Sequence, residues 1–136
     1  MKVKRVIIHA DGASRGNPGP AGIGATIRDE QGRLIASISR GIGRATNNQA
    51  EYRALIAALE EAAKLGASRA NIYLDSELIV KQLNGQYRVR NRALKPLYHQ
   101  AKKLQGLLRG SVVNHIPRHE NNEADTLANI ALRAYS

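Results

Sequence analysis

The sequence predicts an α/β fold, in which a mixed five-stranded sheet carries helices on both faces. Three short apolar segments come first, joined by a turn rich in glycine and proline and then by a hairpin turn. Helical and strand-like segments then alternate, which is the order that places helices against a sheet. The chain has 136 residues, the size of one domain, and we expect residues 1–136 to form a single one.

The first third of the chain is expected to form three strands. The first covers residues 3–11 and is followed by a turn, Gly12–Pro20, that is rich in glycine and proline. Residues 22–28 and 33–42 then form a hairpin about Gln31-Gly32.

The rest of the chain is expected to alternate helices with strands. Helices are predicted at about 48–65, 76–84, 93–109 and 121–134, and strands at 70–75 and 111–117. A crossover through the long first helix makes the strand at 70–75 parallel to the first strand. The ends of these two strands are then expected to lie side by side.

Four carboxylates stand where a globular chain normally places apolar residues. Asp11 and Asp75 close apolar strands, Glu51 lies on the apolar face of the long helix, and Asp125 opens the apolar last helix. A buried carboxylate is unfavourable unless it is paired or bound to a metal, and four together raise one another's pKa values. A divalent cation removes this penalty, so the pattern predicts a metal site.

The charge of the chain indicates a polyanionic partner. Lys and Arg outnumber Asp and Glu by 21 to 11, which gives a net charge of +10. From Leu78 to His119 there are nine Lys and Arg residues and no acidic residue. Nucleic acid is favoured over an acidic lipid surface, because no amphipathic anchor or lipidation signal accompanies the charge.

The composition bears on the compartment. The sequence has no cysteine, which excludes disulfides and thiolate metal sites. It has no apolar run of membrane-spanning length, and its N-terminal apolar stretch is too short for a signal peptide. We expect a cytoplasmic protein that does not associate with membranes and acts as a monomer.

Four segments resemble the motifs of type 1 ribonuclease H. They are residues 11–22 (DGASRGNPGPAG), 46–51 (TNNQAE), 74–76 (LDS) and 119–125 (HENNEAD). They follow the family's order at family-like intervals and cover nearly the whole chain, and the resemblance implies the ribonuclease H-like fold. Residues 84–92 run almost directly into the next helix, and the chain has no Trp. It thus resembles the compact type that lacks the basic protrusion of some members.

The resemblance also implies an activity. Members of the family cleave the RNA strand of RNA–DNA hybrids, leaving 3′-hydroxyl and 5′-phosphate ends, with two Mg²⁺ ions held by four acids. Carried over, these acids are Asp11, Glu51, Asp75 and Asp125, with Asp11 between the two ions, Glu51 and Asp75 on the leaving-group side, and Asp125 on the nucleophile side. Mg²⁺ prefers carboxylate oxygens, and Mn²⁺ could replace it. Whether double-stranded RNA is also cut stays open.

The histidines leave an alternative open. Family members often carry a histidine on the loop before the last aspartate, and His119 is the candidate for this auxiliary catalytic role. The interval from His119 to Asp125 is shorter than in the best-known bacterial members, and His115 is the alternative. His9 alternates with Asp11 on one strand face, where we expect a structural role.

Two groups of residues are predicted to bind substrate. The glycines of the first motif permit positive φ and leave the backbone bare, so that a sugar-phosphate strand can approach. Exposed Asn residues in such segments equally serve as turn residues or helix caps. Candidates from the motifs are Gly12, Ser14, Asn17, Thr46, Asn47, Asn48 and Gln49. In some members of the family the basic protrusion contacts phosphates. Here we expect a basic loop to make these contacts, and we define it by Arg88, Arg90, Arg92 and Lys95.

Four other classes of protein could carry a chain of this kind. A non-catalytic nucleic-acid-binding module is expected to lose at least one of the four acids, and none is missing. An integrase or Holliday-junction resolvase is disfavoured by the Asn-Pro-Gly-Pro turn and the Thr-Asn-Asn-x-x-Glu segment. A ribonuclease H domain of a reverse transcriptase is disfavoured by the start at Met1 and the self-contained length. A scaffold protein does not need clustered inward carboxylates.

Overall fold

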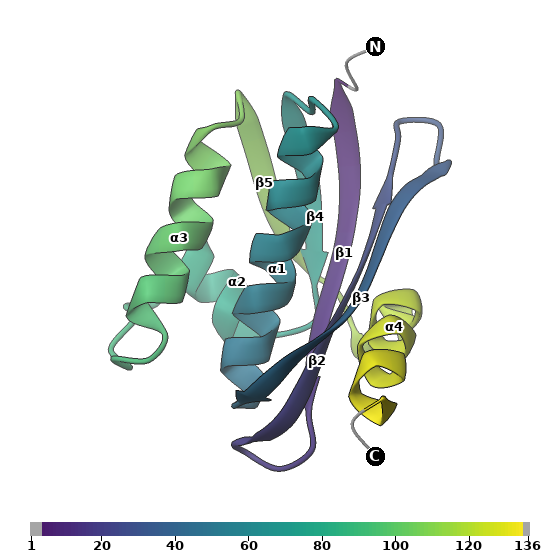
Figure 1. Cartoon of the computed structure of the whole chain (residues 1–136). Helices are drawn as coiled ribbons and strands as arrows, with labels where there is room; N and C mark the ends of the chain where they lie inside the picture. Colours follow the sequence, from purple (N-terminus) through teal and green to yellow (C-terminus); the bar gives the residue numbers. More distant parts are fainter. Residues whose placement is uncertain (1–3, 135–136) are drawn as a thin grey trace.

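The computed structural model describes residues 4–134 (Figure 1). Within these residues the elements are β1 (Arg5–Ser14), β2 (Gly19–Arg28), β3 (Leu34–Ala45), α1 (Asn47–Lys64), β4 (Arg69–Leu74), α2 (Glu77–Leu83), α3 (Lys95–Gly106), β5 (Gly110–His115), the short 3₁₀ helix η1 (Arg118–Glu120) and α4 (Asn122–Arg133). Residue 3, the predicted start of the first strand, lies outside the described residues, as do both ends of the predicted domain 1–136.

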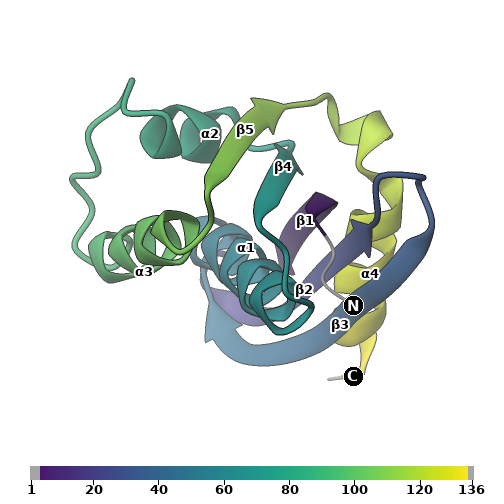
Figure 2. The ribbon, with the colours of Figure 1, turned by 90° about the horizontal axis from the view of Figure 1, so that it is seen from above.

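The five strands form one mixed sheet in the order β3-β2-β1-β4-β5. β1, β2 and β3 are antiparallel, whereas β4 and β5 run parallel to β1. α1 and α3 cover one face and α4 covers the other, as the view from above shows (Figure 2). The predicted five-stranded mixed sheet with helices on both faces is confirmed.

The core lies between the sheet and α1. Val6, Ile8 and Ala10 alternate on β1 and are fully buried, as are Ile72 and Leu74 on β4. The residues that alternate with them, such as His9 on β1 and Tyr73 on β4, are only half-buried, so one face of these strands is fully covered and the other only in part. The face of α1 that carries Glu51 continues through the buried residues Leu55, Ala58 and Ala62. Glu51 therefore extends an apolar stripe toward the sheet, as its spacing predicted.

The first strand is longer than the sequence predicts. β1 continues beyond Asp11 to Ser14, and β2 begins at Gly19, so the predicted turn Gly12–Pro20 is wrong in extent. The antiparallel ladder runs through this region, and the bend is confined to four residues, 15–18, closed by the bond from Arg15 N–H to the Pro20 carbonyl at 2.8 Å. Composition alone suggested a turn, but the ladder partner in β2 decides the structure.

The glycines of the first motif mainly permit close packing. Of the four, only Gly16 has a positive φ, at 100°. A Cβ on Gly12 would overlap the backbone of Ala50, and one on Gly22 would lie 2.6 Å from the Ala128 carbonyl oxygen. The positive φ expected of these glycines is thus wrong for Gly12, Gly19 and Gly22, whereas contact of Gly12 with substrate stays a prediction.

The helices begin and end close to their predicted positions. α1 begins at Asn47, one residue before the predicted start, and Thr46 caps it in a capping box with Gln49. α3 is shorter than predicted, with Pro96 in its first turn, and η1 was not predicted. Among the described residues, none between 84 and 94 is helical, which agrees with the compact type.

Candidate active site

Three of the four predicted carboxylates converge at one edge of the sheet. Asp11 lies on β1, Asp75 directly follows the neighbouring parallel strand β4, and Glu51 lies in the first turns of α1. One carboxylate oxygen from each residue lies within 4.8 Å of the others. Parallel neighbours end at the same edge of a sheet. The absence of a side chain on Gly12 lets α1 approach β1 closely enough to add Glu51.

Asp125 lines the same cleft but stands apart from this group of three. It lies on α4, where Asn129 Nδ2 donates to Asp125 Oδ1 at 3.1 Å. The cleft has a volume of about 350 Å³ and is bordered by Asp11, Gly12, Ala13, Ser14, Asn47, Glu51, Asp75, Arg118, Asp125, Asn129 and Leu132. All four carboxylates predicted from the sequence therefore face one cavity.

Burial and like charge raise the pKa values of two of these groups. Asp11 is 4% exposed, and burial is the main reason why its pKa rises from 3.8 to about 7. Hydrogen bonding with Glu51 lowers the pKa of Asp11, whereas Asp75 and Asp125 raise it. Burial, followed by the charge of Asp11, raises the pKa of Glu51 well above its usual range. These are the effects expected where carboxylates are packed without a compensating cation.

The donor set fits a hard divalent cation. Glu51 Oε2 is buried and has no hydrogen-bond partner among the described residues. Such an atom is unfavourable inside a protein unless it binds something. The surrounding groups are carboxylate oxygens, the ligands that Mg²⁺ and Mn²⁺ prefer. The chain thus presents an acidic cluster suited to a divalent metal ion.

Asn121 is a residue that the sequence did not single out. Its side chain is 1% exposed, and its Nδ2 donates to the Ala10 carbonyl and to Asp75 Oδ2, both at 2.9 Å. It therefore ties the carboxylate of Asp75 to β1. Its place inside the fourth motif was visible, but only the fold shows that it reaches across to β4.

The structure brings Arg118, rather than His119, to the cleft. Arg118 Nη2 lies 3.7 Å from Asp125 Oδ1, and its side chain is 80% exposed. His119 points to Glu120, at 3.8 Å, and lines a separate hollow of about 150 Å³ together with His9. The alternative, His115, ends β5 and is exposed. A catalytic role of His119 stays a prediction that this conformation does not support.

Several predicted substrate-binding residues form one polar network beside the cleft. Ser14 Oγ donates to Asn47 Oδ1 at 2.7 Å, and the Asn47 N–H donates to Asn17 Oδ1 at 2.9 Å. Ser14 and Asn47 also line the cleft. Thr46 and Gln49 are engaged in capping α1, and Asn48 lies half-buried in its first turn. The network Ser14–Asn47–Asn17 is therefore the part of this group best placed to meet a ligand.

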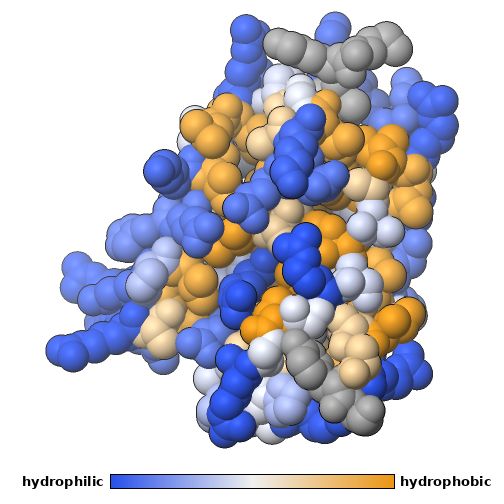
Figure 3. Space-filling model, viewed as in Figure 1, coloured by the Kyte–Doolittle hydropathy of each residue, from blue (hydrophilic) through white to orange (hydrophobic). Residues whose placement is uncertain are grey.

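The basic loop lies on another flank of the molecule. Its four cations are exposed; the three arginines lie between α2 and α3, and Lys95 is the first residue of α3. Figure 3 shows hydrophilic side chains projecting over α3 and the segment that precedes it. Arg88 and Lys95 border a hollow of about 430 Å³ that also includes Tyr87, Tyr98 and His99. The basic loop thus forms a surface separate from the carboxylate cleft.

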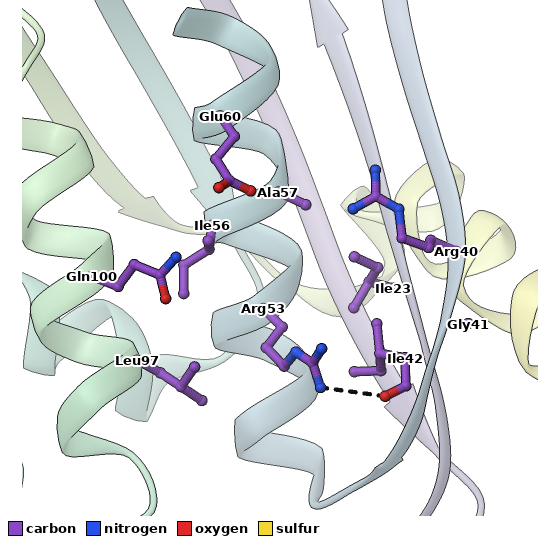
Figure 4. A pocket seen from close by; sticks show the side chains of 10 residues that line it. All are labelled: Ile23, Arg40, Gly41, Ile42, Arg53, Ile56, Ala57, Glu60, Leu97 and Gln100. Carbon is purple, nitrogen blue, oxygen red and sulfur yellow. Dashed lines mark hydrogen bonds between the residues drawn. The ribbon is translucent and has the colours of Figure 1, made fainter.

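A further hollow of about 270 Å³ lies between α1, β3 and α3 (Figure 4). It is lined by Arg40 and Arg53, with Glu60 as its only acid, and Arg53 Nη1 donates to the Ile42 carbonyl at 3.3 Å. One carboxylate beside two guanidinium groups does not make a cation site. Among residues 4–134, the group of acids whose oxygens lie close enough to hold a metal ion together is Asp11, Glu51 and Asp75, in the cleft at the end of β1 and β4.

Comparison with known proteins places the chain in a family. A family model described as "Reverse transcriptase-like" matches residues 9–131. The chain is 33% identical to the ribonuclease H of Chlorobium phaeovibrioides over 145 residues, which covers 96% of this chain and 97% of that protein. The chain belongs to the ribonuclease H family. The resemblance carried by the four motifs is confirmed, and so is the fold that it implied.

Other relatives extend this comparison. The bifunctional protein Rv2228c of Mycobacterium tuberculosis is 47% identical over 131 residues, which covers 96% of this chain but 36% of that protein. The chain thus spans about a third of the length of the first relatives that it matches. The crystal structure of LC11-RNase H1 in complex with an RNA/DNA hybrid is 42% identical, with a TM-score of 0.91 over 96% of this chain and 99% of that one. Among the described residues, no helix is long and apolar enough to cross a membrane.

Proposed function

We propose that the chain hydrolyses the RNA strand of RNA–DNA hybrids in a metal-dependent reaction that leaves 3′-hydroxyl and 5′-phosphate ends. The observation that carries the proposal is the cluster of Asp11, Glu51 and Asp75, whose oxygens lie within 4.8 Å of one another, with Asp125 in the same cleft. The hybrid bound to LC11-RNase H1 supports the choice of substrate. All four carboxylates come from one chain, which supports action as a monomer and a single catalytic domain.

The four acids would hold two Mg²⁺ ions, and Mn²⁺ could replace them. Both Glu51 and Asp125 interact with the Asp11 carboxyl group, which supports the proposal that Asp11 would serve both ions. Glu51 and Asp75 would hold the ion on the leaving-group side, and Asp125 would hold the ion on the nucleophile side. Bound there, such ions activate the attacking water and stabilise the leaving 3′-oxygen of the scissile phosphate.

The remaining side chains act on these carboxylates and on the substrate. Asn121 holds Asp75 in place through its bond to Asp75 Oδ2, so it is a positioning residue. Arg118, beside Asp125, adds a positive charge at the mouth of the cleft, where it can contact the phosphate backbone. The network Ser14–Asn47–Asn17 offers amide and hydroxyl groups to the ribose 2′-hydroxyls that distinguish RNA from DNA.

The basic loop supplies the remaining contacts with the hybrid. Its exposed arginines and lysine can bind phosphates of the DNA strand, as a protrusion does in larger members of the family. The adjoining hollow with Tyr87 and Tyr98 gives this surface an apolar floor. We propose the hybrid as the preferred substrate, with double-stranded RNA as the comparison that defines selectivity.

An end-labelled RNA–DNA hybrid tests the proposal. With Mg²⁺, we expect cuts in the RNA strand alone and 5′-phosphate products, and no cuts in matched single-stranded RNA or duplex DNA. EDTA and the substitution Asp11→Asn should both abolish cleavage. Glu30→Gln, which removes an exposed carboxylate outside the cleft, is the matched control and should retain it. A hybrid that is bound but stays intact with Mg²⁺ and with Mn²⁺ would favour a non-catalytic binding module.

A further inference from the structure

Within the part of the chain that the structure describes, one half of the sheet has no helix on the face that carries α4. α4 packs against β1, β2 and β3 (Figure 2). Beyond it, Val112 on β5 is 55% exposed. Three rows of neighbouring side chains cross β1, β4 and β5 on this face: His9, Tyr73 and Asn114; Ile7, Asn71 and Val112; and Arg5, Arg69 and Gly110. We call these three rows the sheet platform.

The row closest to the catalytic cleft is aromatic. The rings of His9 and Tyr73 are stacked, with centroids 5.0 Å apart and planes inclined by 17°. Both side chains are half-buried, so part of each ring remains open to solvent. The second face of Tyr73 is turned toward β5, where the neighbour is the small amide Asn114, whose Nδ2 donates to the Ile72 carbonyl at 3.2 Å. A planar ring can continue this stack.

The aromatic row lies directly beside the carboxylates. His9 precedes Asp11 by two residues on the same strand, and Tyr73 precedes Asp75 by two. At about 3.3 Å per residue, the aromatic row is about 7 Å from the carboxylate row. A polynucleotide strand that leaves the cleft in this direction therefore passes over the sheet platform.

The far end of the sheet platform is basic. Arg5 and Arg69 are adjacent in the register, exposed, and about 13 Å from the aromatic row. The Arg69 guanidinium extends over β5, because a Cβ on Gly110 would lie 2.8 Å from Arg69 Nη1. On the α4 side of the sheet platform, Glu123 pairs with Arg28 at 2.9 Å, whereas Glu120 is exposed and lies 3.8 Å from His119, beside the aromatic row and away from the arginines. The open charges here are positive and complement phosphate.

We propose that the sheet platform binds single-stranded RNA that continues from the hybrid seated in the cleft. An unpaired base stacks on Tyr73, side-chain amides of Asn71 and Asn114 meet base edges, and Arg5 and Arg69 hold phosphates. Stacking of this kind needs an unpaired base, which excludes a duplex. The strand whose phosphate lies at the carboxylates is RNA, so its continuation is RNA, and this step rests on the proposed function.

The test compares binding of a blunt hybrid with binding of the same hybrid extended by four single-stranded nucleotides. Dissociation constants are measured by fluorescence anisotropy in EDTA, so that nothing is cut. RNA extensions are placed at either end of the RNA strand, and DNA extensions of the same sequence serve as comparison. One of the RNA extensions should tighten binding about tenfold, as expected for a base stacked on an aromatic side chain. The DNA extension of the same sequence should increase the binding affinity less.

Variants locate the effect on the sheet platform. Tyr73→Ala should remove most of the increase in affinity that the RNA extension gives. Arg5→Ala combined with Arg69→Ala should reduce the salt dependence of this increase. Arg33→Ala combined with Lys64→Ala removes two exposed cations elsewhere and should leave the gain intact. The same variants are titrated with an isolated eight-nucleotide RNA, so that the test does not depend on binding of the hybrid.

The outcomes separate this inference from the proposed function. If the blunt hybrid is bound and cut but no extension tightens binding, the sheet platform is not an RNA site. A gain that persists in both Tyr73→Ala and the double arginine variant overturns the assignment to this face. An equal gain from the DNA extension overturns the assignment to RNA. Failure to cut the hybrid contradicts the proposed function. The ratio of the dissociation constants of the blunt and the extended hybrid then still tests the sheet platform.

Discussion

Replacing Asp11 by Asn should stabilise the metal-free protein at neutral and alkaline pH, although it removes a predicted catalytic residue. In the folded chain the pKa of Asp11 is raised from 3.8 to about 7, chiefly by burial. An acid with a raised pKa binds more protons in the folded state than in the unfolded state between these two values. The free energy of unfolding therefore falls as the pH rises from about 4 to about 7, and the loss is complete above pH 7.

The size of the effect follows from the same two values. A difference between 3.8 and about 7 corresponds to about 4 kcal/mol, at about 1.36 kcal/mol per unit of pKa. Asn is neutral and nearly the same size, so Asp11→Asn removes this penalty. For a domain of 136 residues, 4 kcal/mol corresponds to a rise in melting temperature on the order of 10 °C. Relaxation of the neighbouring carboxylates makes this an upper bound.

Thermal melts in EDTA at pH 4, 6 and 8 measure this difference. We expect Asp11→Asn to match the original chain at pH 4 and to exceed it increasingly at pH 6 and 8. Glu30→Gln, at an exposed site, should show no such trend. Saturating Mg²⁺ should raise the melting temperature of the original chain at pH 8 and that of Asp11→Asn much less. A destabilisation by Asp11→Asn that is equal at pH 4 and pH 8 would refute the reasoning.

Three further substitutions test other parts of the structure. Asn121→Ala removes the side-chain amide that holds one of the clustered carboxylates, so it should reduce cleavage about 10- to 100-fold at saturating Mg²⁺. Asn122→Ala changes an exposed neighbour and should have little effect on cleavage. Equal activity of the two variants would contradict the positioning role. Gly12→Ala introduces a Cβ that overlaps the backbone of α1, so it should lower the free energy of unfolding by more than about 1 kcal/mol in denaturant titrations. Gly106→Ala, at a position with open space around the new Cβ, should not lower it in this way. Replacing all four cations of the basic loop by Ala should weaken hybrid binding and reduce the slope of log K against log salt by up to about 4 contacts, and an unchanged slope would show that this surface does not bind phosphate.

Much of the fold follows from local patterns in the sequence. The order of strands and helices and the inward position of the four acids could be predicted, because each depends on the apolar periodicity within one segment. The extent of β1 beyond Asp11 could not be predicted in this way, because Gly12 and its neighbours resemble a turn until β2 supplies the ladder partner. For the same reason the glycine at position 12 could be read as exposed backbone, although α1 covers it.

Side-chain direction at the mouth of the cleft was equally out of reach. Arg118 and His119 are adjacent, and the chemistry of histidine made it the better candidate from sequence. The 3₁₀ geometry of η1 turns Arg118 toward Asp125 and His119 toward Glu120. Asn121 was missed because its partners, the Ala10 carbonyl and Asp75, are distant in sequence. Contacts of this kind depend on the packing of several elements and leave no local signal.

Two close backbone approaches around Asp11 explain how four acids from four elements reach one cleft. Along β1, Gly12 lets the start of α1 approach and brings Glu51 beside Asp11. Across the ladder, Asp11 is paired with Gly24 of β2, and a Cβ on Gly24 would overlap the backbone of α4 at Ala124, next to Asp125. The carboxylates are therefore placed by strands and helices in direct backbone contact. A site fixed in this way keeps its carboxylates close together before a cation arrives, which is why the metal-free protein should show a pH-dependent loss of stability.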